Sequence, residues 1–331
     1  MTDLQAYRGF WHPVARDIDI VPDRPTRLRL LGENLVAFRT EHGISVFKDL
    51  CIHRGTALSL GRVEDGTIEC PYHGWRYDAT GRCVRIPALR PGAPIPGKAR
   101  AIAYRVREYA GLVFVAMEEP RAPFPEFRED YADDDPSLRL TFIASYDWAV
   151  DAGRAVENFL DVAHFPFIHE NTLAARDDTL VHDHHVSEDE YSLSFTYVQV
   201  EPADPMNGQA GAAVSLDYYY RAPFTVHLKR TSEASPNFMV ASLWSCPIEA
   251  GASTLFTTVR RNFDVEPEHD ARFHAFADLV MREDQEVVES VKPEEIPVDL
   301  REELHIKVPD AAGLRLRRIL DRIGRGELAA A

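Results

Sequence analysis

Two short segments in the N-terminal third of the chain each combine one cysteine with one histidine. The four side chains are Cys51, His53, Cys70 and His73, and sixteen residues separate the two segments. Gly55 and Gly74 follow them closely, and glycine permits the tight turns with which a loop wraps a metal. Two thiolates and two neutral imidazoles suit a 2Fe-2S cluster in which each ligand type holds one iron, which raises the reduction potential.

A zinc site with two cysteines and two histidines would use the same residue types. Zinc modules usually pair Cys with Cys and His with His, whereas here each segment supplies one of each. The order of the ligands therefore favours the iron–sulfur cluster. The remaining cysteines, Cys83 and Cys246, are expected to be buried thiols without a role, because free cysteine commonly behaves as a small hydrophobe.

A second group of potential ligands lies in the middle of the chain. Asn158, Asp161 and His164 are spaced by three residues, so a helix predicted over residues 154–165 would place them on one face. Their neighbours are apolar. A buried polar stripe is costly unless its members bind a metal or one another, so this face indicates a metal site.

Pro166 is expected to end that helix, and the turn there to bring His169 beside His164. Two histidines need a carboxylate to complete the facial triad of non-haem Fe(II) oxygenases, which leaves positions open for O2 and substrate. A helix predicted over residues 266–291 offers Asp284, which lies in the middle of its apolar stripe. The alternative is that Asp284 pairs with a core Arg or His.

The elements that must position these groups indicate two domains. A length of 331 residues fits two domains of roughly 100 to 200 residues each. Residues 26–115 contain short β-prone runs separated by glycines, which predicts an antiparallel β domain with a proline-rich surface loop at 87–96. A proline- and acid-rich connector at 118–136 places the boundary so that the domains span residues 1–118 and 119–331.

The second domain mixes predicted strands and helices, which gives an α+β fold class. Its strands are expected at 191–200, 214–220, 238–246 and 254–263, and a charged helix at 314–331. The substrate pocket is expected in this domain, and five aromatic residues on its strands are candidates to line it, although aromatic residues at alternating positions are more often ordinary core. The five are Tyr197, Tyr218, Tyr220, Phe238 and Trp244.

Charge and hydropathy exclude some classes of partner. The net charge of −16 argues against nucleic acid, because phosphates favour Lys and Arg clusters. The chain shows no signal-peptide pattern at its start and no run of about 18 apolar residues, so we expect a soluble cytoplasmic protein without membrane contact.

Both ligand groups resemble those of the Rieske non-haem iron oxygenases. The first matches the Rieske motif C-x-H, sixteen residues, C-x-x-H. Respiratory Rieske subunits add a disulfide-forming cysteine to each loop, at places held here by Thr56 and Tyr72. Residues 157–164 followed by His169, together with residues 283–285, resemble the mononuclear iron motif. Within the family, the short length and residues 9–14 look most like the vanillate and dicamba O-demethylase subgroup.

The resemblance implies a role for each residue. Cys51, His53, Cys70 and His73 would hold the 2Fe-2S cluster, His164, His169 and Asp284 the mononuclear iron, and Asp161 and Asn158 would be catalytic. Asp161 would link the iron site to the cluster ligand His73 of a neighbouring subunit. A head-to-tail homotrimer is implied, with an antiparallel Rieske domain and a catalytic domain whose curved antiparallel sheet is flanked by helices.

The implied function is that of the oxygenase component of a multicomponent system. A separate reductase, with or without a ferredoxin, would pass electrons from NAD(P)H to the cluster, and O2 would be used to hydroxylate or O-/N-demethylate a small aromatic or related substrate. The chain has no G-x-G-x-x-G nucleotide motif, which fits an external reductase. Monooxygenation seen as demethylation is the favoured reaction.

Two alternatives remain. A cis-dihydroxylating ring dioxygenase would usually have a longer subunit, often paired with a small second one, and would form a cis-diol. A non-catalytic electron-transfer or metal-stabilised binding protein would hold one metal centre and would leave His164, His169 and Asp284 unexplained.

Overall fold

The computed structural model describes residues 4–132, 135–170, 172–201 and 213–327. Within this part the chain forms two compact units, Arg8–Pro120 and the rest. No helix in the described residues is both long and apolar enough to cross a membrane.

The first unit, Arg8–Pro120, consists of three small antiparallel sheets. One contains β1 (His12–Arg16), β10 (Leu112–Ala116) and β9 (Arg105–Tyr109), and the second β2 (Thr26–Leu30), β3 (Glu33–Thr40) and β4 (Gly43–Lys48). The third contains β5 (Arg62–Glu64), β6 (Thr67–Glu69), β7 (Arg76–Tyr77) and β8 (Cys83–Arg85). The predicted antiparallel β domain is confirmed, and residues 87–96 lie outside helices and strands as expected.

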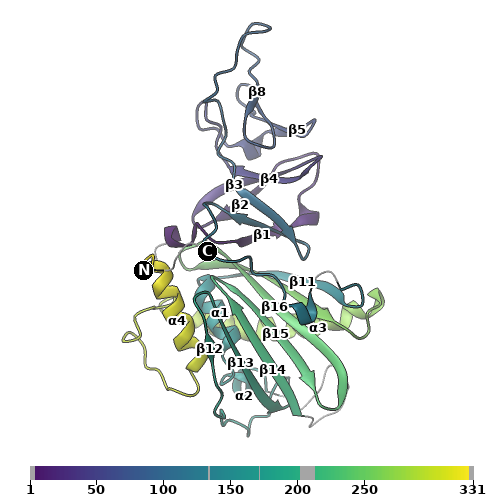
Figure 1. Ribbon diagram of the computed structural model, residues 1–331, viewed down its shortest axis with the longest axis vertical. Coiled ribbons are helices and arrows are strands. Elements are labelled where there is room, and N and C mark those ends of the chain that lie inside the picture. Colours follow the sequence, from purple (N-terminus) through teal and green to yellow (C-terminus); the bar gives the residue numbers. More distant parts are fainter. Residues whose placement is uncertain (1–3, 133–134, 171, 202–212, 328–331) are drawn as a thin grey trace. The chain divides into compact units, whose positions relative to one another are not determined.

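The second unit is built on one antiparallel sheet of seven strands (Figure 1). The strands are β11 (Arg139–Trp148), β12 (Ser187–Glu188), β13 (Ser192–Val200), β14 (Ala213–Arg221), β15 (Thr225–Ser232), β16 (Ser235–Glu249) and β17 (Ala252–Arg261). Their order is β11-β17-β16-β15-β14-β13-β12. The predicted strands correspond to β13, β14, β16 and β17, whereas β11, β12 and β15 were not predicted.

Three helices cover one face of this sheet. They are α1 (Ala152–Leu160), α3 (Asp270–Ser290) and α4 (Ala311–Gly324), and a single turn, α2 (Phe165–Ile168), follows α1. Helix α1 packs against β15, β16 and β17 and contacts both α3 and α4, so all three lie on the same side. Strand β14 alternates buried and partly exposed residues, which is typical of a strand whose inner face packs against other elements.

The helix predicted over residues 154–165 is shorter than expected. Helix α1 ends at Leu160, and Asp161 has extended backbone angles as its C-cap residue. The Asp161 carboxylate accepts hydrogen bonds from the Ala163 N–H at 2.8 Å and from the His164 ring at 3.0 Å. Such side-chain bonds to nearby backbone compete with helix formation. The prediction that Asn158, Asp161 and His164 share one helix face is therefore wrong.

Pro166 begins a helix instead of ending one. It lies in the first turn of α2, where its missing N–H costs no intrahelical hydrogen bond. The predicted apolar stripe of α3 is also narrower than expected, because Val287 is 45% exposed. Cys83 and Cys246 are both buried, as expected.

Candidate metal centres

The two loops that carry the Cys and His pairs are built in the same way. In each, the cysteine carbonyl accepts a hydrogen bond from the N–H of the glycine four residues later, at 2.8 Å for Gly55 and 3.0 Å for Gly74. Both glycines have positive φ angles, +75° and +68°, which residues with a Cβ rarely adopt. The first loop follows β4 and the second follows β6.

The thiols and imidazoles of these loops differ in burial. Cys51 and Cys70 are buried, whereas His53 and His73 are exposed, with their ring centroids 4.6 Å apart. Burial raises the pKa of the Cys70 thiol, and the neighbouring Cys51 thiol adds to this effect, so two thiolates here require a cation beside them. This arrangement fits a 2Fe-2S cluster with its thiolate-held iron inside and its imidazole-held iron at the surface.

A tyrosine hydroxyl touches one of the cluster thiols. The Tyr77 hydroxyl lies 3.1 Å from the Cys51 sulfur, and burial raises the pKa of Tyr77, so the hydroxyl keeps its proton and donates. Hydrogen bonds to cluster sulfurs raise the reduction potential. We expect Tyr77→Phe to lower the midpoint potential by about 40 mV, the one-electron equivalent of roughly 1 kcal/mol.

Spectroelectrochemical titration of the purified protein measures this shift. Tyr104→Phe is the matched control, because the Tyr104 hydroxyl is in the same unit but donates to the Glu33 carboxylate. An unchanged potential in Tyr77→Phe, or an equal fall in both variants, would contradict the role given to Tyr77.

The second centre is formed by three residues from two segments. His164 and His169 flank α2 as its N-cap and C-cap residues, and Asp284 comes from α3. The Asp284 Oδ1 lies 3.5 Å from the His164 Nε2 and 3.2 Å from the His169 Nε2. Ligand atoms of all three lie within 4.8 Å of one another. The three residues are thus close enough to share one ion.

Further carboxylates orient the two imidazoles. The His164 Nδ1 lies 3.0 Å from the Asp161 Oδ2, and the His169 Nδ1 lies 2.7 Å from the Glu283 Oε2. Both imidazoles therefore direct Nε2 toward Asp284. Metal-bound histidines usually donate their other ring N–H to a carboxylate or carbonyl, so this pattern is typical of a metal site.

The electrostatics of the three residues also fit a cation. The Asp284 Oδ1 is buried, yet it makes no hydrogen bond of adequate geometry among the described residues, and such an oxygen is rarely left without a partner. Burial lowers the pKa of His169, but the carboxylates of Asp284 and Glu283 outweigh it and raise that pKa. Two imidazoles and one carboxylate with open positions suit non-haem Fe(II).

A mostly apolar cavity opens beside this centre. It encloses about 980 Å³, counting its open mouth, between the sheet and helices α1 and α3. His164, His169 and Asp284 line it, and so does Asn158 on α1. Of the five aromatic candidates, Tyr218 lines the cavity. The sequence reasoning also gave no role to Glu283, although it precedes Asp284 directly.

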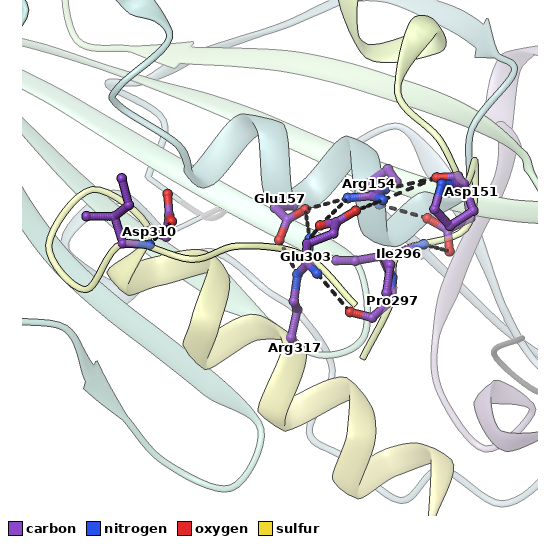
Figure 2. A network of polar contacts seen from close by, with 10 residues as sticks. Asp151, Arg154, Glu157, Ile296, Pro297, Glu303, Asp310 and Arg317 are labelled. Atoms are coloured by element: carbon purple, nitrogen blue, oxygen red, sulfur yellow. Dashed lines mark hydrogen bonds and ion pairs between the residues drawn. The ribbon is translucent and has the colours of Figure 1, made fainter. Parts of the chain in front are cut away.

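An ion-pair network fixes the helix that carries Asn158. Figure 2 shows Arg154 and Glu157 of α1 meeting Glu303 and Arg317. The Arg317 guanidinium donates to Glu157 at 2.6 Å and to Glu303 at 2.5 Å, and Arg154 donates to Glu303 at 2.5 Å. Because Arg317 is on α4, the network joins α1 to α4 through the segment that contains Glu303.

The same network predicts a pH-dependent stability. Partial burial alone would raise the pKa of Glu303, but hydrogen bonds from Arg154 and Arg317 lower it to about 2. A lowered pKa means that the ionised Glu303 stabilises the fold. This stabilisation is fully present at pH values above about 4.5, the ordinary pKa of Glu, and is lost as the pH falls toward 2. We expect Glu303→Gln to cost about 2 kcal/mol at pH 6 and less than half of that at pH 3.

Urea unfolding of both proteins at the two pH values measures this difference. Other acid-sensitive contacts weaken equally in wild type and variant, so the difference isolates Glu303. A cost that is the same at pH 6 and pH 3 would show that the ionised Glu303 contributes nothing.

A β unit with two Cys-His loops, followed by a sheet-and-helix unit with a two-His, one-carboxylate centre, defines the class of Rieske non-haem iron oxygenases. The chain belongs to this family: residues 10–109 match the Rieske [2Fe-2S] domain and residues 148–325 match the vanillate O-demethylase oxygenase C-terminal domain. It is the oxygenase component of a multicomponent system of the demethylase type, with a Rieske cluster, non-haem iron, O2 and electrons from a reductase.

Named relatives are similar over nearly the whole chain. The methylxanthine N1-demethylase NdmA of Pseudomonas putida is 33% identical over 299 residues, covering 88% of this chain and 83% of the relative. The methylxanthine N3-demethylase NdmB of the same organism is 32% identical over 315 residues, covering 89% and 84%.

Solved structures agree with this grouping. NdmA of Pseudomonas putida CBB5 with caffeine has a TM-score of 0.85 at 29% identity, covering 99% of this chain and 94% of that one. Dicamba monooxygenase bound to dicamba, at 20% identity, has a TM-score of 0.79 over 97% and 98% of the two chains and shares the fold. An electron-transfer protein without catalytic iron is therefore not the correct description of this chain.

Proposed function

We propose that this chain removes a methyl group from the nitrogen or oxygen of a small aromatic or heteroaromatic molecule. The observation that carries the proposal is the position of His164, His169 and Asp284 in the wall of a mostly apolar cavity. Flat methylated rings are the kind of ligand that such a cavity buries. The relatives named for N-demethylation of methylxanthines support the same reaction.

The proposal assigns residues to each centre. Cys51, His53, Cys70 and His73 hold the cluster within a domain of residues 1–118, and His164, His169 and Asp284 hold the iron within residues 119–331. Iron held there would supply the reductive activation of O2 by which a C–H bond of the methyl group is hydroxylated. The C–N or C–O bond to the hydroxylated carbon then breaks, so that this carbon leaves as formaldehyde and its hydroxyl proton passes to the nitrogen or oxygen.

Other residues orient the metal ligands and form the wall of the cavity. Glu283 and Asp161 hold the His169 and His164 rings through Nδ1, so that each Nε2 stays available. The apolar lining excludes water from the reacting methyl group. Asn158 lines the cavity and is proposed to be a catalytic group at its wall.

Asp161 is proposed as the electron link between subunits. Its side chain is 34% exposed while it hydrogen-bonds His164, so it offers one side to the metal centre and the other to a partner. In a head-to-tail homotrimer this side would meet His73 of the partner subunit, whose counterpart in this chain is exposed. The electrons are proposed to reach the cluster from a reductase, with or without a ferredoxin between them.

Turnover with a reductase tests the proposed reaction. The purified protein, a Rieske reductase and NADH are incubated with a panel of N- and O-methylated aromatics, and formaldehyde, O2 and NADH are measured together. We expect formaldehyde to appear in step with O2 and NADH consumption. A cis-diol without formaldehyde would favour the ring-dioxygenase alternative and would contradict the proposal.

A further inference from the structure

The cavity wall formed by the sheet carries a tyrosine next to a charged pair. Tyr218 on β14 and Arg230 on β15 line it, together with Glu201, which follows β13. In the strand register Tyr218 faces Leu228 and Arg230 faces Leu216, so Tyr218 and Arg230 are diagonal neighbours on the inner face. Apart from the metal centre, most of the surrounding lining is aliphatic or aromatic.

The Tyr218 hydroxyl is a buried polar group in the part of the chain that the structure describes, and it lacks a hydrogen-bond partner there. The side chain is 1% exposed, and its hydroxyl makes no hydrogen bond among the described residues. A buried hydroxyl without a hydrogen bond is costly, so such a group in a cavity wall indicates a ligand. Its ring is stacked on Phe195, with centroids 4.5 Å apart and an interplanar angle of 8°. The hydroxyl is therefore held in place before a ligand arrives.

The surroundings of Tyr218 keep its proton in place. Burial raises the pKa of Tyr218 well above its ordinary value, and the carboxylates of Asp161, Glu201 and Asp284 add to the effect. A neutral phenol can donate a hydrogen bond. Tyr218 lines the same cavity as His164, His169 and Asp284, where the substrate must lie.

The charges next to Tyr218 cancel. Arg230 and Glu201 are 5% and 1% exposed, and they form a two-point ion pair in which Nε lies 3.2 Å from Oε1. Arg230 is the one Lys or Arg among the described lining residues. A substrate carboxylate on the Tyr218 side of the cavity, away from the iron ligands, would therefore be buried without a cation of its own, which is costly. An uncharged substrate does not meet this cost.

We propose that Tyr218 determines substrate specificity by donating a hydrogen bond to an acceptor oxygen or nitrogen of an uncharged aromatic or heteroaromatic substrate, and that the Glu201–Arg230 pair disfavours carboxylates. This inference rests on the proposed demethylation and names the chemical class of its substrate. It gives Tyr218 a binding role that its position on an alternating strand did not reveal.

Three probes test the assignment on the iron-loaded holoenzyme. They are caffeine and 4-methoxybenzamide, which are uncharged and carry carbonyl acceptors, and 4-methoxybenzoate, which has nearly the shape of the benzamide but carries a carboxylate. Calorimetric titration gives Kd, and formaldehyde release with a reductase gives turnover. We expect the wild type to bind at least one uncharged probe, and the benzamide at least tenfold more tightly than the benzoate.

Two tyrosine variants separate binding from structure. Tyr218→Phe removes the unpartnered hydroxyl and is expected to raise the Kd of the uncharged probes about five- to tenfold, the loss of one hydrogen bond. Tyr220→Phe is the matched control on the same face of β14. Its hydroxyl donates to the Pro223 carbonyl at 2.8 Å, and it does not line the cavity, so its Kd should stay within twofold of the wild type.

Glu201→Gln tests whether the Glu201–Arg230 pair disfavours carboxylates, because this variant should bind a carboxylate more tightly than the wild type does. It removes the negative charge next to Arg230, so the affinity for 4-methoxybenzoate is expected to rise at least tenfold. If this variant does not fold, the proposal is still tested by two results. They are the comparison of Tyr218→Phe with Tyr220→Phe and the preference of the wild type for the benzamide over the benzoate.

An unchanged Kd in Tyr218→Phe, a wild-type preference for the benzoate, or failure of the wild type to bind either uncharged probe would each overturn the assignment. The proposed function is tested separately. The expected binding pattern without formaldehyde release would contradict demethylation and leave the role of Tyr218 standing. Formaldehyde release that Tyr218→Phe does not impair at low substrate concentration would contradict the role of Tyr218 alone.

Discussion

Asp284→Ala is expected to abolish binding of the mononuclear iron while leaving the cluster intact. Among the described residues, Asp284 is the one carboxylate that faces both the His164 and His169 Nε2 atoms. Changes in groups that only orient metal ligands already cost 10–100-fold in affinity or activity, so loss of a ligand should lower demethylation by more than about 100-fold. Iron content, the visible spectrum of the cluster and formaldehyde release measure the three effects.

Glu286→Ala provides the control for this change. Glu286 is exposed on the same helix two residues later, so the variant removes a carboxylate without touching the centre. We expect its iron content and activity to equal those of the wild type. Normal iron content in Asp284→Ala would contradict the assignment of the facial triad.

Arg317→Met is expected to give the largest loss of stability, about 3 kcal/mol in the free energy of unfolding. Arg317 is 2% exposed and bonds Glu157, Glu303 and the Pro297 carbonyl (Figure 2). Methionine has nearly the same length but cannot pair, so the partly buried carboxylates of Glu157 and Glu303 would keep Arg154 but lose their second cation. Urea unfolding followed by circular dichroism measures the change.

Arg301→Met is the matched control for this prediction. The Arg301 side chain is 89% exposed and pairs with Asp299, and exposed ion pairs contribute little. We expect its free energy of unfolding to stay within about 0.5 kcal/mol of the wild type. An equally small effect of Arg317→Met would show that the network does not hold α4 to α1.

The sequence predicted the features that depend on residues close to one another in the chain. Alternating β-prone runs correctly indicated β13, β14, β16 and β17, because inner and outer residues follow the strand period of two. Asp284 was predicted to be a metal ligand because a carboxylate in an apolar stripe needs a partner. The structure brings it beside His164 and His169, as the triad hypothesis required.

The predictions were wrong or incomplete where a side chain bonds to the backbone or to a residue distant in the sequence. Helical spacing could not reveal that the Asp161 carboxylate bonds the Ala163 N–H and ends α1 early. Strand β15 was missed because it contains the charged Arg230, whose partner Glu201 is 29 residues away in sequence. Tyr218 was not assigned to the cavity because residues that pack in the core and residues that line a cavity both occupy the inward-facing, alternate positions of a strand.

Glu283 was overlooked for a related reason. One residue along a helix is a rotation of about 100°, so Glu283 does not share the stripe of Asp284. It reaches the opposite nitrogen of His169 instead, at 2.7 Å. An orienting group of this kind can be recognised only when the ligand that it holds has been placed in three dimensions.

Metal and sulfide analysis of the anaerobically purified protein, together with its reduced-state EPR spectrum, tests the two-centre account most directly. The account predicts about three iron atoms and two acid-labile sulfides per chain, with a Rieske-type signal from the reduced cluster. A protein that contains zinc in place of iron, or that cannot be reconstituted with iron and sulfide, would contradict it.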